Sequence, residues 1–359
     1  MTDDDLTSHE TQESEDGEEG DPRVEAAWRF VDEGNVAGAR RAVAQLPQDS
    51  PDVLLLLAAC CREEDQPDGA MVLLRQAAAA DPQWAVPELW LAEILASHPD
   101  GLPERLDEAL THARRALDLA EDESDYLSAL TLKAGIELEL GQAAEARKTL
   151  ADLPPPEVPV EDLSLALEIA DLHLALGEPE AARARMRTLT AAHPESADAW
   201  HALGSAAADL EDAGEMRSAW KRAWTLDTAP GETQGAGDRL SEEEVAAVAE
   251  AGLEELPARA RELLQGIPIV IAEQPAEADV EAGFDPRALG LFSGTAYPEN
   301  SSLSEGQPGL TQIVLFRRNL ERVAGSEDEL REEIRTTLLH ETGHFFGLED
   351  ADLEELGLD

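Results

Sequence analysis

The sequence has few cysteines and no long apolar run, and each shortage excludes a class of protein. Its two cysteines, Cys60 and Cys61, are adjacent within an Ala/Leu-rich stretch. This excludes a disulfide framework and a cysteine-rich zinc site. No apolar run approaches the roughly 18 residues that cross a membrane, and Met1 to Asp5 lack the basic and apolar regions of a signal peptide. We therefore expect a cytoplasmic protein that does not enter a membrane.

Basic residues are also scarce. Lysine and arginine total 27 against 78 aspartates and glutamates, so the formal net charge is −51. A charge of that sign opposes binding to a nucleic-acid backbone or to an anionic membrane surface. It favours solubility, and it also suits a basic protein partner. Hydrophobic residues still make up 43% of the chain, which is too many for a wholly disordered protein and predicts a sizeable core.

The N-terminal two thirds of the chain divides into a tail and a repetitive region. Residues 1–22 carry ten acidic residues and no basic one, which predicts a disordered acidic tail. From residue 23 to 228 the apolar residues follow a helical period, and the pattern recurs about every 34 residues. The clearest units are 51–84, 163–196 and 197–230, with weaker copies at 20–50, 85–122 and 127–160.

Small and large apolar residues alternate within each unit. In the clearest one, Trp200, Leu203 and Gly204 keep a W-x2-L-G spacing, and Pro230 closes the unit. Small residues let paired helices approach closely, while large ones fill the gaps between them. These residues make the stretch resemble a tetratricopeptide repeat array of about six helix pairs. The resemblance implies an α-helical solenoid whose groove binds a peptide or protein segment.

A second domain follows a Gly-rich linker, predicted at residues 229–239. Residues 240–359 are predicted to fold as a small α+β domain. A capping box at Ser241 and Glu244 opens its first helix, with a break at Pro257. Three strands are predicted, at 267–271, 289–294 and 311–316. A last helix starts after a second capping box at Ser326 and Glu329 and is predicted to run to about Phe346.

The last predicted helix contains the candidate metal-binding and catalytic residues. It contains His340-Glu341-Thr342-Gly343-His344. Positions i and i+4 share one face of a helix, so both imidazoles can bind one ion. Glu341 is rotated about 100° from His340, which places it to hydrogen-bond a water rather than to bind the ion. Two imidazole ligands beside an open position are typical of catalytic zinc.

A third ligand should come from a carboxylate, because the domain has no other histidine and no cysteine. The candidates are Glu349, Asp350, Asp352, Glu354 and Glu355. Gly347 can take a positive φ and turn the chain back toward the ion. Asp350 lies six residues after His344, just beyond that turn, and is therefore the predicted ligand.

The pattern His340-Glu341-x-x-His344-x-x-Gly347-x-x-Asp350 resembles that of the zincin metallopeptidases, and residues 240–359 resemble a bacterial minimal zincin. The resemblance implies Zn²⁺ held by His340, His344 and Asp350, with Glu341 as general base in peptide-bond hydrolysis. Tyr297, the domain's only tyrosine, is a candidate oxyanion donor. The alternative function is an interaction scaffold whose zincin domain binds metal with little or no turnover.

Overall fold

The computed structural model describes residues 21–98, 103–229, 240–256, 258–294 and 311–348. These residues belong to two compact units, residues 1–154 and 155–359. Within the described residues, no helix combines the length and the apolar character needed to cross a membrane.

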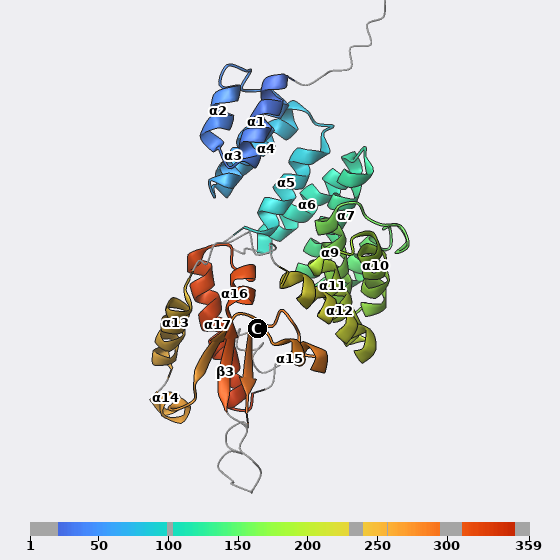
Figure 1. The fold of residues 1–359 in the computed structure, drawn as a ribbon. Coiled ribbons are helices and arrows are strands. Elements are labelled where there is room, and N and C mark those ends of the chain that lie inside the picture. The colour runs from blue at the N-terminus through green and yellow to red at the C-terminus, as the bar shows by residue number, and fades with distance from the viewer. Residues whose placement is uncertain (1–20, 99–102, 230–239, 257, 295–310, 349–359) are drawn as a thin grey trace, which may run out of the picture. The chain divides into compact units, whose positions relative to one another are not determined.

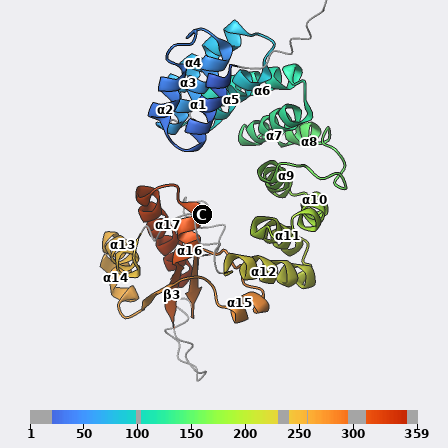
Figure 2. The ribbon, with the colours of Figure 1, turned by 45° about the horizontal axis from the view of Figure 1, so that its top comes forward.

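The repetitive region is a series of paired α-helices (Figure 1). The first compact unit contains α1 (Pro22–Asp32), α2 (Val36–Val43), α3 (Pro51–Glu63), α4 (Pro67–Ala80), α5 (Ala85–Ala96), α6 (Pro103–Leu119), α7 (Glu123–Glu139) and α8 (Ala143–Leu150). The second unit begins with α9 (Leu163–Ala175), α10 (Pro179–Ala192), α11 (Ala197–Asp209) and α12 (Ala213–Asp227). Figure 2 shows α9 to α12 as successive antiparallel pairs. Helix α1 begins at the last residue of the predicted acidic tail, whose residues 1–20 lie outside the described residues.

The turn inside most helix pairs contains a residue in the left-handed region. Gly34, Gly141 and Gly177 have φ between 68° and 72°, and Asp65 and Glu211 take φ of 53° and 56° at the corresponding turns. Within each pair, small buried residues allow close packing. A Cβ placed on Gly204 would overlap the indole of Trp220, so α11 and α12 can pack as they do only with glycine at this position.

The remainder of the second unit contains three strands and five helices among the described residues. In chain order these are α13 (Glu242–Glu255), α14 (Ala258–Leu264), β1 (Ile269–Ala272), α15 (Glu277–Ala282), β2 (Gly290–Ser293), β3 (Gln312–Phe316), α16 (Arg317–Val323) and α17 (Glu327–Phe345). All three predicted strands are present, whereas the short helices α15 and α16 were not predicted. The fold class predicted from sequence, a helical-repeat solenoid followed by a small α+β domain, is confirmed.

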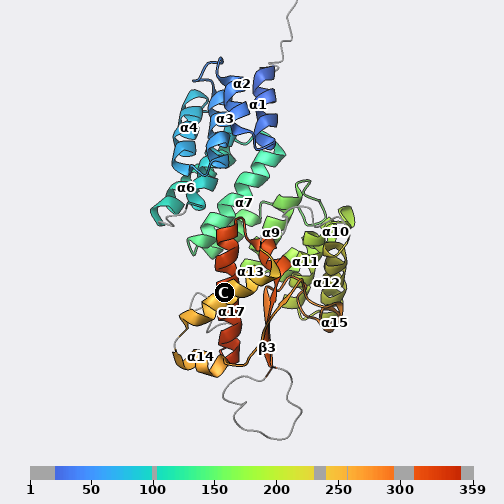
Figure 3. The ribbon, with the colours of Figure 1, turned by 60° about the vertical axis from the view of Figure 1, so that its left-hand side comes forward.

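The sheet has the strand order β1-β3-β2, so β3 is central. Strand β1 pairs parallel to β3, and β2 pairs antiparallel to it with Gly290 opposite Leu315. Helix α17 contacts β2 and β3, and α13 contacts β1 and α17. Figure 3 shows α17 and α13 together at the sheet. Their shared core contains Val245, Ala249, Ile313, Leu315, Leu330, Ile334 and Leu338.

The two predicted capping boxes differ in the structure. Ser241 and Glu244 form a complete reciprocal box at α13. At α17, Ser326 accepts from the Glu329 N–H as predicted, but the Glu329 carboxylate accepts from the Gly325 N–H instead of the Ser326 N–H. The second box is therefore incomplete, although both side chains still satisfy backbone donors at the start of α17. Pro257, the predicted helix break, lies outside the described residues, between α13 and α14.

Candidate metal centre

Helix α17 brings the two predicted histidine ligands together. Leu330, Ile334 and Leu338 are spaced four apart and are fully buried, which fixes the rotation of the helix on the sheet. His340 and His344 consequently lie one turn apart on a neighbouring face. Their Nε2 atoms are 3.0 Å apart, with ring centroids 4.7 Å apart. The sequence prediction that these two imidazoles share one face of a helix agrees with this geometry.

The donor arrangement at the histidine pair fits zinc. Two nitrogens that each lie roughly 2.0–2.1 Å from a tetrahedral ion are separated by about 3.3 Å, close to the 3.0 Å between the Nε2 atoms. His344 Nδ1 lies 3.0 Å from the carbonyl oxygen of Leu348. When Nδ1–H donates to that carbonyl, Nε2 carries the lone pair of the ring and can bind a metal.

Gly347 creates the turn that supplies this carbonyl. It takes φ of 81°, the left-handed conformation that glycine adopts without steric cost. The Gly347 N–H donates to His344 O and the Leu348 N–H donates to Gly343 O, so the turn satisfies two carbonyls at the end of α17. The positive φ of Gly347 is predicted from the sequence and is confirmed, whereas the contact between the Leu348 carbonyl and His344 is not predicted.

Glu341 lies between α17 and the edge strand β2. The residue is 7% exposed. A Cβ built on Gly290 would be 2.9 Å from both Cγ and Oε1 of Glu341, and 2.8 Å from Cγ2 of Thr337. The backbone of Gly290 therefore forms the surface on which the Glu341 side chain rests. Sequence reasoning missed Gly290, although a glycine inside a predicted strand is a known signal of close approach.

The remaining predicted site residues have no described position. Asp350 lies outside the described residues, as do Tyr297 and the other carboxylates considered as third ligand. Within the ranges that the structure describes, no group of three or more His, Cys, Asp or Glu side chains is arranged to hold a metal ion. The described part of the site therefore consists of His340, Glu341 and His344.

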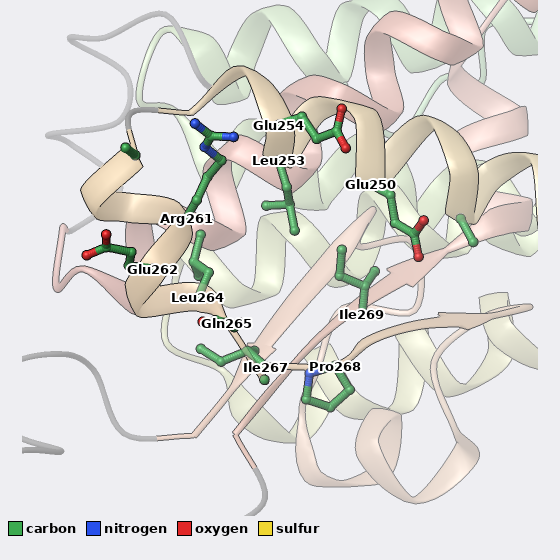
Figure 4. A pocket seen from close by; sticks show the side chains of 13 residues that line it. Glu250, Leu253, Glu254, Arg261, Glu262, Leu264, Gln265, Ile267, Pro268 and Ile269 are labelled. Atoms are coloured by element: carbon green, nitrogen blue, oxygen red, sulfur yellow. The ribbon is translucent and has the colours of Figure 1, made fainter.

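A separate hollow of about 720 Å³ lies between α13, α14 and β1 (Figure 4). Leu253, Leu264 and Ile269 form its apolar wall, and Glu250, Glu254 and Glu262 contribute acidic groups at its edge. None of His340, Glu341 and His344 lines this hollow. Although this hollow is large, its lining separates it from the candidate metal centre.

Two family models match separate parts of the chain. Residues 264–358 match the family described as "Zincin-like metallopeptidase", and residues 167–232 match the family described as "Tetratricopeptide repeat". The chain thus combines tetratricopeptide repeats with a zincin-like metallopeptidase domain. No curated protein matches the chain.

Several solved tetratricopeptide repeat structures are similar to part of the chain. One is TTC0263, a thermophilic TPR protein from Thermus thermophilus, with 18% identity, coverage of 52% of this chain and 97% of that one, and a TM-score of 0.41. Another is pilF of Pseudomonas aeruginosa, with 20% identity, coverage of 59% and 94%, and a TM-score of 0.44.

Proposed function

We propose that the zincin-like domain is a zinc-dependent peptidase and that the helical repeats bind its protein substrate or a partner. The observation that carries the proposal is the convergence of the His340 and His344 Nε2 atoms, 3.0 Å apart, on the helix that also bears Glu341. A purely structural zinc site needs no carboxylate at the position after the first histidine. Asp350 is proposed as third ligand and Tyr297 as oxyanion donor.

Each residue of the candidate site has a separate role in the proposed hydrolysis. When bound, zinc would supply Lewis acidity that polarises the scissile carbonyl and acidifies a water molecule. His340 and His344 would provide two of its ligands, and the Leu348 carbonyl fixes the ring orientation of His344. Glu341 accepts the proton from the attacking water and passes it to the leaving amine. Its low exposure limits competing contacts with bulk water, and Gly290 restricts where its carboxylate can move.

The repeats support a role in recruitment. Tetratricopeptide repeats generally bind protein segments, and the net charge of −51 favours a basic one. A cytoplasmic location is part of the proposal, as are the domain limits at 22, 228 and 239. These assignments rest on sequence composition and on the repeat pattern.

The decisive experiment compares zinc-loaded wild type with Glu341→Gln on a diverse peptide library. Glu332→Gln is the matched control, because it makes the same chemical change on α17 at a side chain that is 71% exposed. We expect turnover by wild type and by the control, and loss of at least about 100-fold in Glu341→Gln. Equal turnover by all three proteins, or none by wild type, would favour the scaffold function instead.

A further inference from the structure

The terminal helix pair, α11 and α12, contacts the zincin-like domain within the second compact unit. Helices α12 and α15 pack together, as Figure 2 also shows. Trp224 Nε1 donates to the carbonyl of Pro275 at 3.0 Å, and Lys221 forms ion pairs with Glu277 and Glu281. The terminal pair is therefore joined to the domain by specific polar contacts.

Arg287 and Asp227 form a largely buried ion pair at this junction. Its guanidinium donates to both carboxylate oxygens of Asp227, at 3.0 and 3.3 Å, and lies 2.7 Å from Asp198. The Arg287 and Asp227 side chains are each only 14% exposed. Burial alone would lower the pKa of Arg287, but the two carboxylates outweigh it and the pKa is raised. Arg322 adds a second guanidinium 2.9 Å from Asp227.

Asp285 joins the same segment to the terminal helix pair at a second point. Its Oδ1 lies 2.9 Å from His201 Nε2 on α11 and accepts from the Arg287 backbone N–H at 2.7 Å. Burial would raise the pKa of Asp285, but its hydrogen bond with His201 and the neighbouring charges lower it overall. Two side chains of the segment 285–287 thus bind α11 and α12.

This segment continues directly into the strand that supports Glu341. Three residues after Arg287 the chain reaches Gly290, on whose backbone the Glu341 side chain rests. Asn319, which is 4% exposed, donates from Nδ2 to the carbonyls of Pro286 and Ala288, on either side of Arg287. The terminal helix pair is therefore connected to Glu341 through Arg287, the two residues that follow it and the backbone of Gly290.

We propose that Arg287 is a positioning residue, through which the terminal helix pair holds β2 in place against Glu341. Because coupling of this kind passes through packed and hydrogen-bonded groups, loss of the guanidinium should loosen the 285–289 segment and β2 together. The predicted effect on turnover rests on the peptidase function proposed above. The predicted effect on β2 does not, because it concerns the metal-free chain.

The test uses the full chain and the variant Arg287→Gln, which keeps a polar side chain but removes the charge. Arg331→Gln is the control, since Arg331 pairs with Glu327 on α17 and lies away from the junction. Hydrogen–deuterium exchange of the metal-free proteins is measured in peptides covering 275–289 and 290–294. We expect faster exchange in both peptides for Arg287→Gln and in neither for the control.

The competing explanation is that Asn319 and the pairing of β2 with β3 hold β2 without any contribution from Arg287. In that case exchange would rise in 275–289 and stay unchanged in 290–294, and the proposal would be overturned. Unchanged exchange in both peptides would overturn it as well. Should Arg287→Gln fail to fold, Asp198→Asn gives the milder test, because it removes the more exposed partner and leaves the Asp227 pair intact.

Turnover of the zinc-loaded proteins then separates positioning from binding. We expect Arg287→Gln to lower kcat by roughly tenfold or more with little change in KM, and Arg287→Lys to recover part of the loss. An unchanged kcat in a variant whose β2 exchanges faster would refute the link to Glu341. A wild type without turnover would instead refute the peptidase function, while the exchange data would still decide whether Arg287 positions β2.

Discussion

Gly290→Ala should damage the candidate site without touching a histidine. The added Cβ would lie 2.8 Å from Thr337 Cγ2 and 2.9 Å from Glu341 Cγ and Oε1, and real Cβ atoms essentially never approach so closely. Thr337 and Glu341 are 7% exposed and sit on a helix whose core residues are fully buried. Neither side chain can swing into solvent, so either β2 or the Glu341 carboxylate must shift.

The cost can be estimated from overpacking. Inserting a methyl group into a packed site typically costs about 1–3 kcal/mol. For a unit of this size each kcal/mol lowers Tm by roughly 2–4 °C. Thermal unfolding of the metal-free protein measures this cost. Turnover of the zinc-loaded protein measures the displacement of Glu341, and we expect it to fall by at least about tenfold, because small misplacements of a reacting group are costly.

Gly252→Ala is the matched control. Gly252 lies within α13 and also faces α17, but its added Cβ would meet the nearest atom, Leu338 Cδ2, at 3.4 Å. Alanine is favoured over glycine inside a helix by up to about 1 kcal/mol, so this variant should be as stable as wild type or more so. The reasoning is refuted if Gly290→Ala keeps both the Tm and the turnover of wild type.

Three further outcomes are expected. Asp350→Ala should release zinc to a chelator far faster than wild type, while Glu349→Ala should behave as wild type; the reverse result would mean that Glu349 is the third ligand. Gly204→Ala should destabilise the terminal helix pair by about 1–3 kcal/mol or more in urea unfolding, since its Cβ would overlap the Trp220 ring. Asp285→Asn should flatten the pH dependence of stability in acid. The pKa of Asp285 is lowered in the folded state, so its stabilising contribution is present above the unfolded pKa and is lost as the pH falls through the folded pKa. If the free energy of unfolding of Asp285→Asn falls between about pH 5 and 3 as steeply as that of wild type, this prediction is wrong.

Much of the fold could be predicted because it is encoded locally. Helical periodicity, a 34-residue repeat and β-branched runs each depend on neighbours along the chain, and the structure contains the helix pairs and all three strands. The histidine pair was predictable for the same reason, because one helical turn separates His340 from His344. The helices α15 and α16 were missed since each is only six or seven residues long, too short to show a period.

The contacts around Glu341 and Arg287 could not be predicted in this way. Gly290 meets Glu341 across 51 residues of sequence, and Arg287 meets Asp227 across 60. Such pairs exist only once the sheet has formed and the terminal helix pair has packed on the domain. The sequence marked Gly290 as a glycine within a strand, but nothing local identified the side chain that would occupy the space.

The charge of the chain gives the junction at Arg287 a particular importance. Acidic residues outnumber basic ones both in the repeats and in the zincin-like domain, so an interface between the two needs cations where acidic side chains meet. Arg287 and Arg322 supply them between Asp198 and Asp227. At physiological salt, exposed charges more than about 8 Å apart are largely screened, whereas a partly buried pair is screened much less. Moderate salt should therefore weaken the general repulsion more than it weakens the Arg287 contacts. It follows that the partly buried contacts of Arg287 should persist at the ionic strength of a cell, together with the other polar contacts that join the terminal helix pair to the domain.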